Sequence, residues 1–177
     1  MNKKPKIAIV AALCAVGLVV AANYFQLQRP LSLVLNSDPR NRGISASAHY
    51  EYYIIPSSLI FNLKSVSPER SPADVTRVLL QYAETQKSRD FSVVKLSYAG
   101  REKFMLKGGY FKNLGQEFKS QNPVYTIRTM PENTYKLDGS PAFQTWTGGV
   151  LGVLNRQMSD FIEFHQEWYA SDISEKQ

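Results

Sequence analysis

Cysteine is almost missing from this chain of 177 residues, because its one cysteine, Cys14, lies inside an apolar run. The rest of the sequence can therefore form no disulfide bond, and it offers no thiol nucleophile and no thiolate ligand for a metal. A domain without cysteine suits an oxidising compartment, although this composition alone does not assign one.

Histidine is nearly as scarce, with His49 and His165 as the two in the chain. His49 and Glu51 share one face of an expected strand. Two histidines without an HExxH pair or a similar spacing do not make a zinc site, however. The sequence therefore predicts neither a metal nor a cofactor.

Motifs of the common enzyme classes are absent as well. Gly108-Gly109 joins an expected strand to an expected helix, but neither the dinucleotide-binding nor the P-loop spacing is present. No serine-hydrolase elbow and no kinase motif set occurs. Paired catalytic carboxylates keep no fixed spacing, so these absences favour a protein that is not an enzyme without excluding one.

The chain does have an uncharged stretch from Ile7 to Phe25, preceded by Lys3, Lys4 and Lys6. About 20 apolar residues suffice for a helix to cross about 30 Å of hydrocarbon. The positive-inside rule keeps the lysines in the cytoplasm and places the C-terminal domain outside. The stretch therefore predicts a single-pass anchor in a bacterial inner membrane with a periplasmic domain.

A cleaved signal peptide is the alternative interpretation of this segment. Its start is basic, and Val20-Ala21-Ala22 resembles the small-residue pattern at a cleavage site. Cleavage near Ala22 would release a secreted domain. A buried helix of a soluble domain is disfavoured, because a helix that is apolar on every face needs a larger core than this chain offers.

The net charge of +6 does not indicate a nucleic-acid partner. Three of the 21 Lys and Arg residues precede the apolar stretch, which leaves 18 against 15 acidic residues in the remainder. Residues 95–119 are locally basic. A solvated sheet edge is the favoured interpretation of that segment, and contact with an anionic envelope polymer is the sharper alternative.

Composition divides the chain into four parts. Residues 1–27 form the anchor or signal segment, 28–45 a linker rich in turn residues, 46–170 the extracytoplasmic domain, and 171–177 a flexible tail. Within the linker, Leu31 to Leu35 predicts a short strand.

The domain is expected to be a two-layer α+β fold, with helices on one face of a mostly antiparallel sheet. Ser71-Pro72-Ala73-Asp74 has the pattern of a capping box and begins an amphipathic helix. Strands are predicted at 46–55, 59–66, 91–98, 102–107 and 124–130, and further helices at 110–118 and 149–169.

The last helix places apolar side chains on one face: Met158, Phe161, Ile162, His165, Trp168 and Tyr169. His165 is expected to be buried with one hydrogen-bond partner, because the neighbouring glutamates point away from it. Three glycines beside Trp146 indicate a loop or a groove rim. A ligand or partner surface is therefore sought at Trp146, Gly148, Gly149, Tyr125, Arg128, His165 and Trp168.

Three functions fit these observations. The leading hypothesis is a membrane-tethered envelope protein whose domain acts by contact with a protein or polymer. The second is a small-ligand binder with a pocket between the sheet and the last helix, lined by Trp146, Phe161, His165 and Trp168. The third is a hydrolase that uses His165 or His49 as a base.

Overall fold

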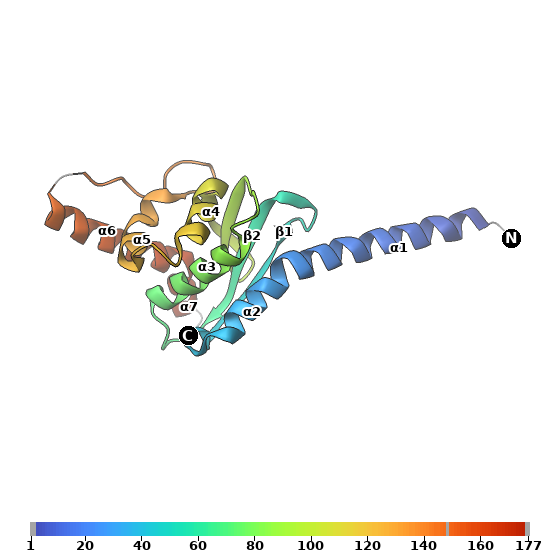
Figure 1. Cartoon of the computed structure of the whole chain (residues 1–177), viewed down its shortest axis with the longest axis horizontal. Helices are drawn as coiled ribbons and strands as arrows, with labels where there is room; N and C mark the ends of the chain where they lie inside the picture. The colour runs from blue at the N-terminus through green and yellow to red at the C-terminus, as the bar shows by residue number, and fades with distance from the viewer. Residues whose placement is uncertain (1–2, 148, 176–177) are drawn as a thin grey trace.

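The fold is the predicted two-layer α+β arrangement: one mixed, mostly antiparallel sheet of five strands with helices on one face. The computed structural model describes residues 3–147 and 149–175 (Figure 1). The strands are β1 (Ile44–Glu51), β2 (Ile55–Val66), β3 (Val93–Tyr98), β4 (Arg101–Lys107) and β5 (Thr134–Tyr135). The sheet order β1-β2-β3-β4-β5 follows the sequence, and β2 and β3 are the parallel pair, joined through the helix α3 (Pro72–Gln86).

The N-terminal helix does not end where the apolar stretch ends. It runs through α1 (Lys3–Asn23), a π-helical turn η1 (Tyr24–Gln28) and α2 (Arg29–Ser37) without an intervening loop. Figure 1 shows α1 projecting far from the domain, whereas α2 lies along it. Leu27, Leu31 and Val34 are buried in the core.

This continuity corrects the prediction for residues 28–45. The predicted strand at Leu31 to Leu35 is wrong, because the segment is helical and buries one stripe of side chains against the sheet and α3. Apolar residues at 27, 31 and 34 follow the helical spacing that such burial needs. The expected linker therefore shrinks to the turn around the short helix η2 (Pro39–Asn41).

Helix α3 (Pro72–Gln86) begins as its sequence predicts. The Ser71 hydroxyl accepts from the Asp74 backbone N–H, and the Asp74 carboxylate accepts from the Ser71 N–H. These reciprocal bonds satisfy two donors that a helix start otherwise leaves free. The helix then buries its expected apolar stripe: Val75, Val78, Leu79 and Tyr82.

The strand predicted at 124–130 is wrong. This segment is helix α5 (Pro123–Thr129), which follows α4 (Gly108–Glu117). The Asn122 side chain accepts from the Val124 N–H, and Pro123 occupies the first turn. Asn122-Pro123 is thus a helix start of the same kind as Ser71-Pro72, and this local signal prevails over the β-branched residues that follow.

The C-terminal helix continues beyond its predicted end, through α6 (Val150–His165), η4 (Gln166–Ala170) and α7 (Ser171–Ser174). Phe164, which the helical-wheel argument missed, is fully buried, whereas Ile162 is exposed. Residues 171–174 also differ from the expected flexible tail. The Asp172 carboxylate accepts from Arg101 at 2.7 Å and from Lys103 at 3.1 Å, which fixes the chain end to β4.

Close approach between α3 and α4 depends on Gly115. A Cβ atom at this position would overlap the backbone carbonyl of Ala83, whereas one at Gly109 would meet nothing within 4 Å. We expect Gly115→Ala to lower the free energy of unfolding by about 1–3 kcal/mol through overpacking. Gly109→Ala, in the same helix, should leave it unchanged or raise it by up to about 1 kcal/mol.

Thermal unfolding of the full chain in mild detergent checks both variants. A loss of stability in Gly109→Ala as large as that in Gly115→Ala would contradict this account of the α3–α4 contact.

Candidate functional site at the junction of the N-terminal helix and the sheet

Four of the predicted surface residues lie on α5 or in the segment directly before α6 (Val150–His165), and both helices are at the end of the domain opposite α1 (Figure 1). The Arg128 Nε donates to the Gln157 side chain at 3.0 Å, which links α5 to α6. The Trp146 indole donates to Asp160 at 2.6 Å. Gly149 is the N-cap of α6, and Tyr125 is an exposed residue of α5. Gly148, also predicted for this surface, lies outside the described residues.

His165 and Trp168 belong to the core instead of this surface. Trp168 is fully buried and its indole donates to the Ser97 carbonyl at 3.2 Å. His165 is 1% exposed and packs edge to face against Phe161 and Phe164. Its Nε2 lies 2.9 Å from the Thr76 hydroxyl, and its Nδ1 is buried without a partner among the described residues. The sequence predicted a single partner but did not identify it as Thr76.

Burial decides what His165 can do chemically. Loss of hydration disfavours the imidazolium form and lowers the pKa of His165 from 6.5 to about 3. A neutral, enclosed ring cannot reach a substrate, so the hydrolase hypothesis that used His165 as its base is removed. Nor do Phe161, His165 and Trp168 line a cavity with Trp146. The first three pack on one another, whereas the Trp146 indole donates to Asp160 in the second half of α6.

A surface hollow of about 670 Å³ does lie beside His165 and Tyr169. Its other wall is the turn between β2 and α3, including Arg70. In the described part of the chain, neither Trp146 nor Trp168 lines this hollow. It is therefore a different site from the pocket that the sequence suggested between the sheet and the last helix.

The uncovered face of the sheet carries His49 and Glu51, side by side as the strand periodicity predicts. Lys95 donates to Glu51 at 2.6 Å and to Glu102 at 3.0 Å. The hydrogen bond from Lys95 is the main cause that holds the pKa of Glu51 below its ordinary value. Glu51 of β1 is thus a charged carboxylate in an ion-pair network with Lys95 of β3 and Glu102 of β4. A carboxylate held in its charged form in this way is not a ready proton donor.

Ion pairs likewise engage the basic segment 95–119. Lys112 pairs with Asp90, Lys119 with Glu84, and Lys107 lies 4.6 Å above the ring centroid of Tyr135. Arg101 and Lys103 share Asp172, as described above. Acidic partners within the domain thus offset much of the charge that suggested an anionic polymer.

A cluster of long-range side-chain hydrogen bonds lies where the N-terminal helix meets β1. The Asn23 side chain is buried: its oxygen accepts from the Tyr50 backbone N–H at 2.8 Å, and its nitrogen donates to the Tyr53 carbonyl at 2.8 Å. The Gln28 side-chain oxygen accepts from the Ala48 N–H at 3.0 Å. Strand β1 is the edge of the sheet, so these amides take the place of a neighbouring strand.

The π-helical turn accounts for this alignment. Residues five apart in an α-helix point in directions about 140° apart. In η1 the Arg29 N–H bonds instead to the Tyr24 carbonyl, a five-residue step that brings Asn23 and Gln28 onto one side. Their targets, Tyr50 and Ala48, are two residues apart and point the same way along the strand.

A second layer of polar contacts surrounds this junction. The Gln26 side-chain oxygen accepts from the Tyr50 hydroxyl at 2.5 Å and from Arg89 at 2.8 Å. The Tyr82 hydroxyl, deep in the core, donates to the Leu27 carbonyl at 3.4 Å, and burial raises its pKa well above the usual range. The helix is thereby joined to β1, α3 and the segment that precedes β3.

Comparisons with protein-family models, with curated proteins and with solved structures find no match. Function must therefore be argued from the geometry of the chain. Among the described residues, the stretch Ile9–Ser37 of the N-terminal helix is long and apolar enough to cross a membrane, as an anchor or as a signal sequence. Large apolar side chains in its first part are more than half exposed: Ile9, Val10, Leu13, Val16, Leu18, Val20, Tyr24 and Phe25.

Sequence reasoning missed the role of Asn23, Gln26 and Gln28. All three follow directly after the apolar run, and they were counted as the end of the anchor or as linker. Side-chain amides that recur at this spacing beside buried leucines are the signal that could have indicated a docked helix, because amides can satisfy exposed strand edges.

Asn23→Ala should loosen this junction. The Tyr50 N–H would lose its acceptor, which typically lowers the free energy of unfolding by about 1–3 kcal/mol when the donor stays buried. Hydrogen exchange at the Tyr50 amide should accelerate, while exchange in β3 should change little. The matched control is Asn36→Ala, which removes a solvent-exposed bond to the Ser32 carbonyl in the same helical run. Equal effects of the two substitutions would contradict a specific role for Asn23.

His165 should make stability depend on pH. The unfolded chain takes up a proton at this residue below pH 6.5, and the folded chain takes it up only near pH 3. Above pH 6.5, neutral His165 therefore makes its full contribution to the free energy of unfolding. That free energy falls by about 1.4 kcal/mol per pH unit as the pH decreases from 6.5 toward 3.

Urea unfolding at pH 6.5 and pH 5 measures this slope. His165→Gln, which keeps an acceptor for Thr76 but cannot titrate, should flatten it, and His49→Gln should not. An unchanged slope in His165→Gln would show that other groups carry the pH dependence.

Proposed function

We propose that this protein is a single-pass, membrane-anchored envelope protein whose α+β domain acts by protein contact outside the cytoplasm. The observation that carries the proposal is the unbroken helix from Lys3 to Ser37, exposed and apolar in its first half and built into the core in its second. A domain held in this way presents its surfaces in a defined orientation to the bilayer. A fixed orientation is useful to a protein that acts by contact with a partner, and it is of little use to a protein that acts while it diffuses freely.

An anchor is favoured over a cleaved signal because of where the cleavage pattern falls. Val20-Ala21-Ala22 lies within α1, directly before the buried Asn23, in a helix that shows no break there. Lys3, Lys4 and Lys6 at the start of the chain favour a cytoplasmic N-terminus. The domain would then lie on the periplasmic side of a bacterial inner membrane.

The surface best placed for a partner is the end of the domain formed by α5 and the start of α6. Val124 and Tyr125 are both at least half exposed there. On α6, which the Arg128–Gln157 hydrogen bond joins to α5, Arg156 lies 4.4 Å above the ring centroid of Trp146. Exposed aromatic and arginine side chains are typical of protein interfaces, whereas the paired lysines of residues 95–119 give less support to an anionic polymer.

Membrane retention is tested with the native chain expressed from its own N-terminus. We expect the intact mass in the membrane pellet after an alkaline carbonate wash, because the apolar helix remains in the bilayer. A soluble product that lacks about 22 residues would contradict the anchor and support a secreted domain.

The partner surface is tested by photo-crosslinking in cells, with a photoreactive phenylalanine at Tyr125. The matched control carries the same group at Lys64, an exposed residue on the uncovered face of β2. We expect one discrete protein adduct at Tyr125, absent at Lys64 and weakened by Val124→Ser. Equal adducts at both positions, or none at Tyr125, would contradict a partner at this surface.

A further inference from the structure

The turn between β1 and β2 exposes a row of large apolar and aromatic side chains. Tyr52, Tyr53 and Ile54 are 76%, 53% and 67% exposed. The run from Tyr52 to Ser58 contains no charged residue. Exposed apolar groups that gather in one place usually mark a binding surface, because water disfavours them.

The turn has a backbone that its residues rarely adopt. Tyr52 and Tyr53 have φ angles of 49° and 65°, and the Ile54 N–H donates to the Glu51 carbonyl at 3.2 Å. Two successive positive φ angles are typical of a type I′ turn, which favours Asn-Gly. Bulky residues in this region are strained and persist where the surrounding structure holds them. Here the Tyr53 ring stacks on His49, with the ring centroids 4.5 Å apart, whereas Tyr52 and Ile54 remain largely exposed.

The turn also lies beside the point where the apolar helix enters the domain. The Asn23 side chain donates to the Tyr53 carbonyl at 2.8 Å, and Tyr24 and Phe25 follow it with their rings in edge-to-face contact. Figure 1 shows the β1–β2 turn on the side of the domain from which α1 projects. Both tyrosines of the turn are therefore held near the helix position where Tyr24 and Phe25 begin.

The length of the helix sets that position relative to a bilayer. From Ile7 to Phe25 an α-helix rises by about 27 Å, close to the hydrocarbon thickness of about 30 Å. Tyr24 and Phe25 would then lie at the headgroup level, where aromatic rings are enriched in membrane proteins. The turn that contacts Asn23 would lie at the same level.

We propose that the β1–β2 turn is a second membrane contact, in which Tyr52, Tyr53 and Ile54 enter the headgroup region of the outer leaflet. This inference rests on the proposed anchoring of α1. A single helix leaves a domain free to tilt, and a second contact at the rim of the domain restricts that tilt. It would hold the α5–α6 end away from the bilayer, toward a partner.

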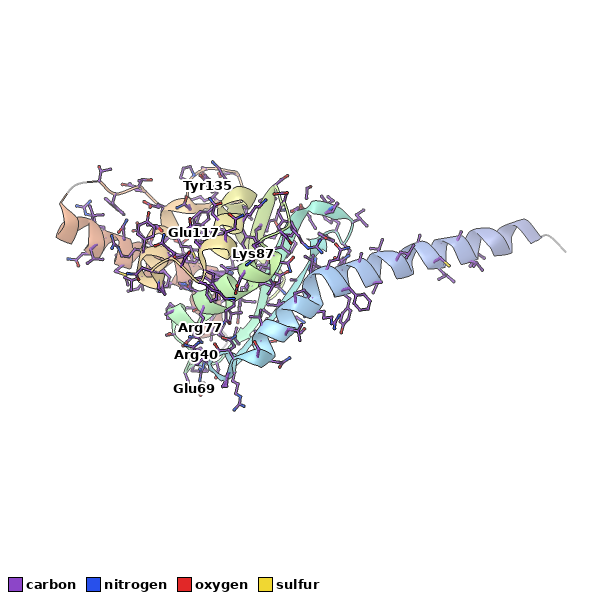
Figure 2. All side chains as sticks on the ribbon, in the orientation of Figure 1. Arg40, Glu69, Arg77, Lys87, Glu117 and Tyr135 are labelled. Carbon is purple, nitrogen blue, oxygen red and sulfur yellow. The ribbon has the colours of Figure 1, made fainter. Side chains whose placement is uncertain are left out.

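Quenching by brominated lipids tests the contact in the full chain reconstituted into nanodiscs. The reporter is Tyr52→Trp, and the matched control is Leu137→Trp, a residue 48% exposed in the turn after β5. Figure 2 labels Tyr135, two residues before that position, on the side away from α1. The wild-type chain supplies the background from Trp146 and Trp168. We expect at least a twofold loss of the added emission for Tyr52→Trp and almost none for Leu137→Trp.

A second reporter, Ile54→Trp, covers the case in which tryptophan at position 52 disturbs the turn, since Ile54 does not have a positive φ angle. Tyr52→Asn provides a further check, because asparagine tolerates this backbone and removes the ring. This substitution should leave the thermal midpoint unchanged or higher and should reduce quenching of the reporter at position 54.

Flotation of the same nanodiscs separates the two proposals. Bilayer-bound protein with no quenching of the tryptophan at position 52 or at position 54 would overturn the membrane contact of the turn. The proposed anchoring by α1 would remain supported. Equal quenching at positions 52 and 137 would also overturn it, because the domain would then lie flat on the lipid. Protein that fails to remain with the bilayer would overturn both proposals.

Discussion

The hydrogen bonds that the Asn23 and Gln28 side chains accept from the open edge of β1 are the contacts on which the rest of the structure depends. An edge strand exposes unpaired N–H groups that readily pair with other chains. In this protein the helix that leaves the apolar segment satisfies two of those groups itself. The same hydrogen bonds therefore protect the sheet edge and attach the N-terminal helix to the domain.

These bonds explain why the helix must continue past its exposed, membrane-length segment into α2. Leu27, Leu31 and Val34 bury one stripe of the helix against β1 and α3, and the π-helical turn aligns the amides with the strand. A flexible linker would provide neither. The apolar half of the helix therefore extends from a domain whose direction is already set, and the β1–β2 turn lies beside the point of exit.

Local sequence signals predicted much of this fold. The capping box at Ser71 and the hairpin of β3 and β4 formed as expected, because each depends on residues close in sequence. The burial of His165 also followed from helical spacing. Two predicted strands, Leu31 to Leu35 and Val124 to Met130, are helical instead; both are short segments where apolar periodicity is ambiguous and the helical ends decide the outcome. The strand predicted at 46–55 ends at Glu51, where the turn to β2 begins.

The candidate site was less predictable than the fold. Tyr125, Arg128 and Trp146 were chosen for composition, and the contacts between α5 and α6 gather them at one end of the domain. Asn23 and the β1–β2 turn could not be related from sequence, because the bond between them joins residues 30 positions apart. Long-range hydrogen bonds of this kind leave no periodic pattern.

Hydrogen exchange across Tyr24 to Gln28, in the wild-type chain held in nanodiscs, tests most directly whether the helix and the domain form one rigid unit. The account predicts protection in this turn as strong as that in the interior strand β2, because the same global unfolding must expose both. Exchange within seconds at these residues, with β2 still protected, would reveal a hinge and contradict a domain held in a fixed orientation.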